Sequence, residues 1–364
     1  MPCGDGQSIM TSRLRLAALA VFLGGGLAGG INDAHAWPLL PGPLDNAPAS
    51  LAPLVKLVAP SVVGIAVTEA PGIAATPHPL HTDGRPPQPP IGQAAGSGFI
   101  VTTDGMIVTN DHVIAGAAHI TVTLDDGSHY TARLVGADDL TDLAVIKITS
   151  SSALVPIRWG DSSAVQVGDW VLAAGNPFAL GNSFTLGIIS AEGRDIGDGP
   201  FTHFLQLDAP INPGNSGGPS FNMQGQVIGI NAAIVSPSGG SVGIGFAIPS
   251  NGAAPIVAEL IAHGVVPRGW LGVAVADPPS NPSGQTQGAV ITGLEPGSPA
   301  DIAGLAPGEL VLTVNGIAIS GADGLTRAIA GLQPGAKVVL GIGGITHISE
   351  IQVIVGRRPA QLGE

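Results

Sequence analysis

The sequence predicts an all-β first domain, a sandwich or a barrel, followed by a smaller domain of mixed β and α structure. Glycine and proline, 55 and 32 of 364 residues, are abundant, which favours many short strands joined by turns. Short apolar runs alternate with the turn sequences TDG, DDG, GNP and NMQG, whose residues tolerate positive φ. Because 45% of the residues are hydrophobic and only 11% are charged, the chain can bury a substantial core, and disorder throughout is excluded.

The apolar runs place the strands of the first domain at 62–67, 96–101, 106–110, 120–124, 131–136, 143–148, 170–175 and 225–231. One helix is predicted near the end of this domain, capped by Asn251 and ending at Gly264. The second domain combines five apolar strand patterns with two short helical patterns near 298–304 and 322–331. About 90 residues of this kind form a small, partly open sheet.

The first 36 residues have the pattern of an export signal. Arg13 and Arg15 precede an apolar stretch, and Ala34-His35-Ala36 fits a small-x-small cleavage site. We expect a signal peptide cleaved after Ala36, the alternative being a retained anchor, and hence an exported, periplasmic protein. The remaining chain divides into a Pro-rich segment, a first domain that contains a mobile loop, a second domain and a tail, at 37–50, 51–264 (loop 69–95), 265–358 and 359–364.

The composition argues against several classes of partner and cofactor. With a net charge of −13 and no basic run, the chain on average repels a phosphate backbone, so no nucleic acid is expected. Cys3 is the single cysteine, which excludes an internal disulfide and any Cys-rich metal site. The pair His78 and His81 has Pro-rich surroundings and no nearby carboxylate cluster. We therefore expect no metal and no cofactor.

Three segments carry residues suited to nucleophilic catalysis. Ser216 lies among three glycines in GNSGGP (214–219), where a tight turn exposes a hydroxyl and aims two N–H groups at one point. His112 follows an apolar strand in TNDHVI, and Asp142 directly precedes another in TDLAV. Taken singly, each has an ordinary reading as a glycine-rich turn, a structural histidine or a cap. Together, the order His, Asp, Ser on an all-β chain matches the chain order of the catalytic triad on double β-barrels.

Over residues 50–358, the chain resembles the HtrA/DegP-type serine proteases. The family's stretches stand here as GSGFIV, VTNDHVI, TDLAVIKI, AAGNPFALG, GIISAEGR, QLDAPINPGNSGGP, GQVIGIN and GIGFAIPS. The resemblance implies a chymotrypsin-like protease domain of two six-stranded β-barrels, followed by one small α+β PDZ domain. It also implies an assembly of three chains through the protease domains, or a multiple of three.

The triad chemistry assigns a role to each residue. Ser216 attacks the scissile carbonyl, His112 takes and later returns the proton, and Asp142 orients and stabilises the imidazole. By resemblance, the backbone N–H groups of Gly214 and Ser216 form the oxyanion hole. Because His112 must be neutral to act as a base, activity should fall below about pH 6–7.

The resemblance also suggests a pocket for the substrate side chain before the scissile bond. The residue six positions before the nucleophile is Pro210, and Ala232 and Ala233 could form the opposite wall. A trypsin-like pocket would need an acid at position 210. We therefore predict cleavage after small or medium apolar residues such as Val, Ala or Ile.

In the second domain, Gly269, Trp270, Leu271 and Gly272 resemble the carboxylate-binding loop of a PDZ domain. Such a loop holds the terminal carboxylate of a peptide that adds a strand to the sheet edge. C-terminal peptides are therefore expected partners, whereas the alternative is a domain used only for packing between subunits.

These inferences lead to an exported serine endopeptidase of protein quality control that degrades unfolded or damaged proteins. Its PDZ domain would regulate it or supply substrate. Two alternatives remain open: a chaperone or holdase whose proteolysis is incidental, and a PDZ-gated stress sensor that cleaves one dedicated regulatory protein.

Overall fold

The computed structural model describes residues 50–69, 94–176, 181–196, 201, 203–236, 240–279, 287–343 and 348–359. The predicted signal peptide, the Pro-rich segment up to residue 49, residues 70–93 of the predicted loop and residues 360–364 of the predicted tail lie outside these ranges. The residues from Ser50 onward form one unit of the chain.

The first barrel is closed, with the strand order β1-β2-β3-β6-β5-β4. Alternate residues of β1 point to different cores: Val63, Ile65 and Val67 lie inside the barrel, whereas Val62 packs outside it. All pairings in this barrel are antiparallel. The strands are β1 (Val62–Glu69), β2 (Ala94–Ile100), β3 (Met106–Thr109), β4 (Ala117–Thr123), β5 (His129–Asp138) and β6 (Leu143–Lys147).

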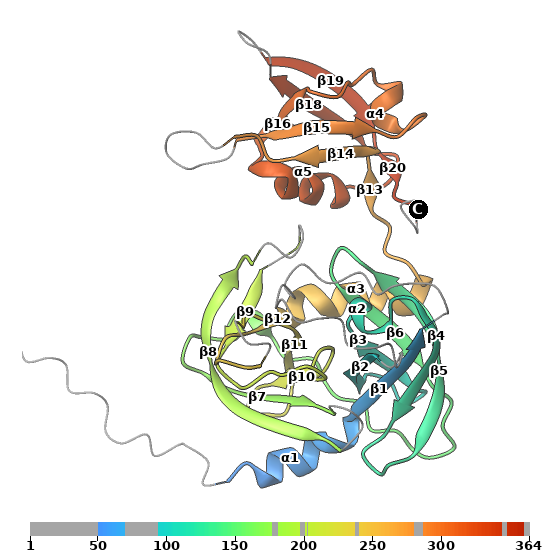
Figure 1. The fold of residues 1–364 in the computed structure, drawn as a ribbon, viewed down its shortest axis with the longest axis vertical. Helices are drawn as coiled ribbons and strands as arrows, with labels where there is room; N and C mark the ends of the chain where they lie inside the picture. Colours follow the sequence, from blue (N-terminus) through green and yellow to red (C-terminus); the bar gives the residue numbers. More distant parts are fainter. Residues whose placement is uncertain are drawn as a thin grey trace, which may run out of the picture. The chain divides into compact units, whose positions relative to one another are not determined.

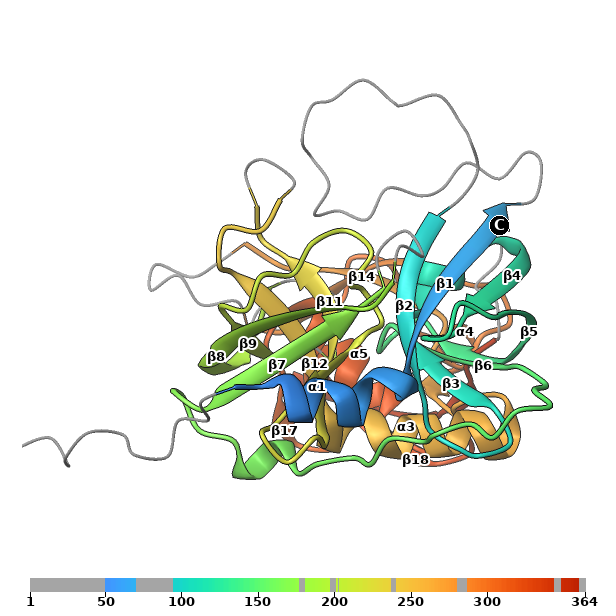
Figure 2. The ribbon, with the colours of Figure 1, turned by 90° about the horizontal axis from the view of Figure 1, so that it is seen from below.

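The second barrel is also closed and antiparallel, with the order β10-β11-β12-β9-β8-β7. Figures 1 and 2 show the two barrels side by side, the first in blue to green and the second in green to yellow. Its strands are β7 (Trp170–Gly175), β8 (Ser183–Arg194), β9 (Phe204–Leu207), β10 (Pro219–Phe221), β11 (Val227–Ile234) and β12 (Gly245–Pro249).

A shared apolar cluster joins the two barrels. Phe99 of the first barrel packs edge-on against Trp159, with ring centroids 5.4 Å apart, and Phe221 of the second barrel is buried in the same cluster. Helix α3 (Ser250–His263) covers this cluster with the buried residues Ala253, Val257 and Leu260. This cluster packs the two barrels against each other.

The start of α3 differs from the expectation. Pro249 occupies the N-cap position, and Asn251 lies inside the first turn, where its side chain bonds Ser162 N–H and the Asp161 carboxylate. The predicted cap at Asn251 is therefore wrong, because a partner distant in sequence takes its side chain. The helix does end at Gly264, whose φ of 73° is the left-handed conformation that favours glycine.

Two short helices of the first domain were not expected. Helix α1 (Ala52–Val58) packs Val58 into the cluster between the barrels, and α2 (Asp111–Ile114) is a single turn that follows β3. Single-turn 3₁₀ helices lie at Ala59–Ser61 and Ser162–Ala164. Within the described ranges, no helix has both the length and the apolar character needed to cross a membrane.

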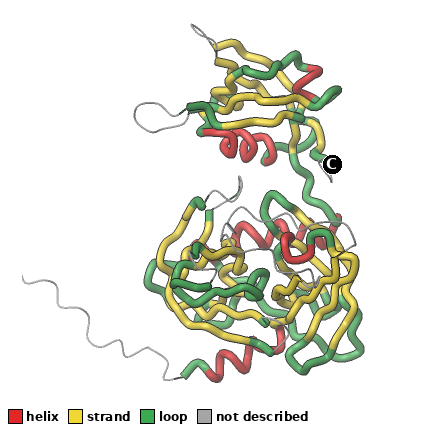
Figure 3. The backbone as a smooth tube through the Cα atoms, in the orientation of Figure 1, coloured by secondary structure: helices red, strands yellow, loops and turns green. Residues whose placement is uncertain are grey.

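The second domain is a sheet of the order β14-β15-β16-β18-β19 with two helices, coloured in Figure 3 by secondary structure. The observed architecture confirms the predicted pair of six-stranded barrels followed by a small α+β domain. The elements of the second domain are β13 (Gly269–Trp270), β14 (Val273–Ala276), β15 (Ala289–Leu294), α4 (Pro299–Ile302), β16 (Leu310–Val314), β17 (Ile317–Ala318), α5 (Gly321–Ala330), β18 (Lys337–Gly343), β19 (Ile348–Ile354) and β20 (Gly356–Arg357).

Candidate active site

The structure brings His112 and Asp142 together from different elements. His112 lies in α2, directly after β3, and Asp142 directly precedes β6, which pairs with β3. His112 Nδ1 lies 2.8 Å from Asp142 Oδ2, and the backbone N–H of His112 donates to Asp142 Oδ1 over 3.0 Å. Both carboxylate oxygens are therefore engaged by the same histidine, which holds the ring orientation.

The backbone of Asp142 has an unusual conformation. Its φ is 53°, in the left-handed region that Asp and Asn tolerate better than most residues. The buried Asn110 donates from Nδ2 to the carbonyl of Asp142 over 2.8 Å. This bond stabilises the turn that aims the carboxylate at His112.

The loop that carries Ser216 is bonded to the first barrel. The carbonyl of Ser216 accepts a hydrogen bond from Ser97 N–H of β2 over 2.8 Å. At Gly217, whose φ is 82°, a Cβ would lie 2.3 Å from Thr109 Oγ1 and 3.0 Å from the N atom of Asn110. Ser216 is thus anchored beside Thr109, the last residue of β3. Helix α2, which carries His112, begins two residues later in the chain.

The two predicted oxyanion-hole N–H groups lack a hydrogen-bond acceptor among the residues that the structure describes. Gly214 has a φ of 98°, a conformation that glycine adopts without strain. Within the described part of the chain, neither Gly214 N–H nor Ser216 N–H has an acceptor, whereas the N–H groups of Asn215, Gly217 and Gly218 are bonded to carbonyls. Two free donors beside a serine hydroxyl can stabilise an oxyanion.

Asp111 adds a second carboxyl group next to His112, besides that of Asp142. The pKa of the Asp111 carboxyl is raised to about 6, mainly by burial and in addition by the neighbouring carboxylates of Asp142, Asp139 and Asp138, whereas His112 acts in the opposite direction. A carboxyl group that titrates near pH 6 therefore lies next to the proposed general base.

The predicted pocket residues occupy different environments. Pro210 is exposed, Ala233 is half-buried, and Ala232 is buried with Phe204 and Phe246. The neighbouring Ile211, which the sequence reasoning missed, packs against Gly245 of β12, where a Cβ would approach its Cγ1 to 2.8 Å. The pocket assignment stays a prediction, and its apolar character agrees with these neighbours.

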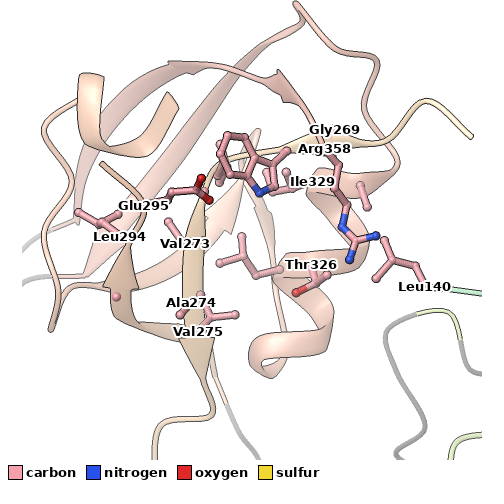
Figure 4. Close-up of a pocket in the computed structure, with 16 residues that line it drawn as sticks. Leu140, Gly269, Val273, Ala274, Val275, Leu294, Glu295, Thr326, Ile329 and Arg358 are labelled. Atoms are coloured by element: carbon pink, nitrogen blue, oxygen red, sulfur yellow. The ribbon is translucent and has the colours of Figure 1, made fainter. Parts of the chain in front are cut away.

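The predicted carboxylate-binding loop lines a groove of about 530 Å³ in the second domain. Figure 4 shows Val273 to Val275 of β14 on one side, with Thr326 and Ile329 of α5 opposite. Gly272 has a φ of 77°, and a Cβ there would lie 2.2 Å from the Ser298 side chain. In the described ranges, the N–H groups of Leu271 and Gly272 have no acceptor, as a carboxylate site requires.

The comparisons with known proteins agree with this geometry. Residues 96–230 match the family model of a trypsin-like peptidase domain, and residues 290–342 match that of a PDZ domain. The structure of "HtrA-type protease AlgW with decapeptide" is 38% identical, with a TM-score of 0.69, and the alignment covers 85% of this chain and 99% of that one. The chain belongs to the HtrA family.

Two further proteins are similar to this chain. The solved "serine endoprotease from Yersinia pestis" is 32% identical, with a TM-score of 0.65 over 86% of this chain and all of that one. The "Probable periplasmic serine endoprotease DegP-like" of Brucella suis biovar 1 (strain 1330) is 44% identical over 299 residues, 80% of this chain. The HtrA chain described here spans 57% of that curated relative's length.

Several residues of this candidate site were not singled out by the sequence. Asn110 and Asp111 lie inside the motif that carries His112, and Ser97 lies inside GSGFIV, so their motifs were visible but their roles were not.

Within the described residues, no group of three His, Cys, Asp or Glu side chains could hold a metal ion.

Proposed function

We propose that the protein is an exported, periplasmic serine endopeptidase that hydrolyses peptide bonds of unfolded or damaged proteins. The observation that carries this proposal is the hydrogen-bonded pair His112–Asp142 beside a serine loop with two free N–H groups. The names of the relatives, periplasmic endoproteases and HtrA-type proteases, support the same activity and compartment.

The proposed reaction uses the three side chains in sequence. His112 removes the proton of Ser216 as the hydroxyl attacks the substrate carbonyl, and Asp142 stabilises the resulting imidazolium through Nδ1. The tetrahedral oxyanion accepts bonds from the N–H groups of Gly214 and Ser216. His112 then protonates the leaving amine, and water hydrolyses the acyl-enzyme by the same steps in reverse.

Asp111 is expected to set the acid limb of the activity. Replacement of Asp111 by Asn removes a negative charge next to His112, so the pKa of His112 falls and the acid limb of kcat/KM moves to lower pH. The control variant Asp126→Asn changes an exposed turn and should leave the profile unchanged. An identical profile for Asp111→Asn and the wild type would contradict this electrostatic coupling.

The same substitution has a pH-dependent effect on stability. The carboxyl of Asp111 has a pKa of about 6 in the folded protein, above its ordinary value of 3.8, so folding favours the protonated form. Its contribution to stability is therefore lost as the pH rises from about 4 to above 6. Relative to wild type, Asp111→Asn should raise the Tm at pH 8 more than at pH 4.

The proposed substrate preference is for small or medium apolar residues before the scissile bond. The surroundings support it, because Ile211, Phe204 and Phe246 are buried near the predicted pocket residues. Apolar residues of a substrate become accessible mainly when the substrate unfolds, which fits a role in quality control. A peptide-library profile dominated by Arg or Lys would contradict this preference.

We further propose that C-terminal peptides bind the groove of the second domain and regulate the protease. Leu140, two residues before Asp142, lines this groove together with Arg358, and Arg358 forms an ion pair with Asp139. A peptide in the groove would therefore touch the segment that leads to the catalytic carboxylate. This contact supports coupling between peptide binding and catalysis.

The expected assembly is a homotrimer or a multiple of trimers. Exposed Val167, Trp170 and Leu186 lie on or beside the paired strands β7 and β8 and offer an apolar surface for association. Light scattering of the purified protein tests this assembly.

The decisive experiment incubates the purified protein with unfolded casein, with and without peptides that end in apolar residues, and sequences the products. Cleavage after apolar residues, increased by the peptides and absent in Ser216→Ala, is the expected result. Intact casein under all conditions would overturn the proposed activity.

A further inference from the structure

Ser97 is a buried hydroxyl residue that contacts the nucleophile loop at two points. Its side chain is fully buried in β2. Its Oγ donates to the carbonyl of Gly214 over 2.6 Å, and its backbone N–H donates to the carbonyl of Ser216 over 2.8 Å. Ser97 therefore holds the two residues whose N–H groups form the proposed oxyanion hole.

The direction of the Ser97 hydroxyl hydrogen is determined by its second partner. The backbone N–H of Asn176 donates to Ser97 Oγ over 2.7 Å, so this oxygen is an acceptor on that side. The hydroxyl hydrogen is then free to be donated to Gly214. Since a Cβ on Gly175 would lie only 2.9 Å from Ser97 Oγ, the hydroxyl is tightly enclosed, and its loss would leave both partners buried without a bond.

The carbonyls of Gly214, Asn215 and Ser216 in the nucleophile loop all accept hydrogen bonds. Gly214 and Ser216 bond to Ser97, and the carbonyl of Asn215 accepts from Gly218 N–H over 3.0 Å. Each peptide unit is planar, with its N–H opposite its carbonyl. The peptide plane between Gly214 and Asn215 lies in the chain between the two peptide planes that carry the N–H groups of Gly214 and Ser216. A hydrogen bond that holds this central plane therefore restricts how the two donor planes turn relative to each other.

We propose that Ser97 is a positioning residue for the oxyanion hole: its hydroxyl holds the Gly214 carbonyl, so that the N–H groups of Gly214 and Ser216 converge on the reacting oxygen. This inference rests on the proposed protease function. Ser97 does not touch the substrate and acts only through the nucleophile loop. The two N–H donors stabilise the charge that develops on the substrate's carbonyl oxygen in the transition state. Loss of the Ser97 hydroxyl should therefore lower kcat and leave KM almost unchanged.

The test compares Ser97→Ala with Ser250→Ala in the full chain. Ser250 is the matched control, because it is equally buried and donates to the carbonyl of Gly160 over 2.8 Å, outside the candidate site. Direct loss of an oxyanion donor lowers turnover by about 10²–10³-fold, so we expect a smaller loss of roughly 10- to 100-fold for Ser97→Ala. Ser250→Ala should retain the kcat of the wild type.

Two further measurements separate positioning from simple damage to the fold. Titration with a phosphonate that labels Ser216 counts the reactive sites, so that kcat is expressed per reactive site. A peptidyl boronate with a valine-like side chain forms a tetrahedral adduct, and its inhibition constant should rise by the same factor as kcat falls. Ser97→Cys, which retains a weak donor of similar size, should give an intermediate kcat, and it carries the test if Ser97→Ala does not fold.

Each outcome has a defined meaning. A kcat per reactive site within about twofold of wild type in Ser97→Ala, or a change confined to KM, would overturn the role of Ser97. Full kcat in Ser97→Cys when Ser97→Ala does not fold would also overturn it. A wild-type protein that neither cleaves casein nor reacts with the phosphonate would instead refute the proposed function itself.

Discussion

Ser216→Ala is expected to abolish proteolysis, with a loss in kcat on the order of 10⁶-fold. The hydroxyl is the only group of the proposed site that forms a covalent bond to the substrate, so His112 and Asp142 have nothing to activate when it is absent. The residual rate would come from substrate binding and the two free N–H groups of Gly214 and Ser216. Initial rates on a fluorogenic peptide and on unfolded casein measure this loss.

The control for this variant is the integrity of the rest of the molecule. Ser216→Ala removes one partly buried hydroxyl, so its Tm and its affinity for C-terminal peptides should match those of the wild type. The same variant decides between the proposed protease and a holdase. If suppression of aggregation persists at full strength without cleavage, chaperone activity is independent of the triad. Casein cleavage at the wild-type rate would remove Ser216 from the mechanism.

Asp142→Asn is expected to lower kcat by about 10⁴-fold while leaving the fold intact. Asn tolerates the positive φ of 53° at this position, so the turn is retained. The backbone N–H of His112 would keep the side-chain oxygen that it now bonds, which turns the amide NH₂ toward His112 Nδ1. Nδ1 must then accept, the ring proton moves to Nε2, and the imidazole cannot act as a base toward Ser216.

The comparison with Asp142→Ala tests this explanation. The alanine variant loses both hydrogen bonds to His112 and adopts a positive φ that Asn accommodates more easily, so it should also lose stability. We expect Asp142→Asn to have a Tm within a few degrees of the wild type. An asparagine variant with kcat within tenfold of wild type would show that the carboxylate does not control the tautomer of His112.

Part of the site was predictable because it depends on local sequence. The glycines around Ser216 permit the positive φ values that expose its loop, and the apolar runs before His112 and after Asp142 predict the strands that present them. The position of Ser97 inside GSGFIV was equally visible. Its role was not, because an alternating strand pattern does not reveal which partner a buried hydroxyl meets.

The misplaced or missed features depend on contacts between distant segments. Asn251 resembles a helix cap, but Ser162 and Asp161, about 90 residues earlier, bond its side chain. Helix α1 is too short to be predicted from periodicity and is held by the packing of Val58 between the barrels. The raised pKa of Asp111 likewise depends on the tertiary structure, which buries its carboxyl and brings the carboxylates of Asp142, Asp139 and Asp138 near it.

The sequence alone indicated that the chain folds into short strands with glycine turns, and it indicated the candidate reactive groups, because backbone preferences and side-chain periodicity act between residues close in the chain. The tertiary structure decided that His112 and Asp142 lie 2.8 Å apart and that Ser97 holds the carbonyls of Gly214 and Ser216. Those distances follow from strand register and from the closure of both barrels. A local pattern does not specify them, because a shift of one residue in register would turn every side chain of a strand to the other face.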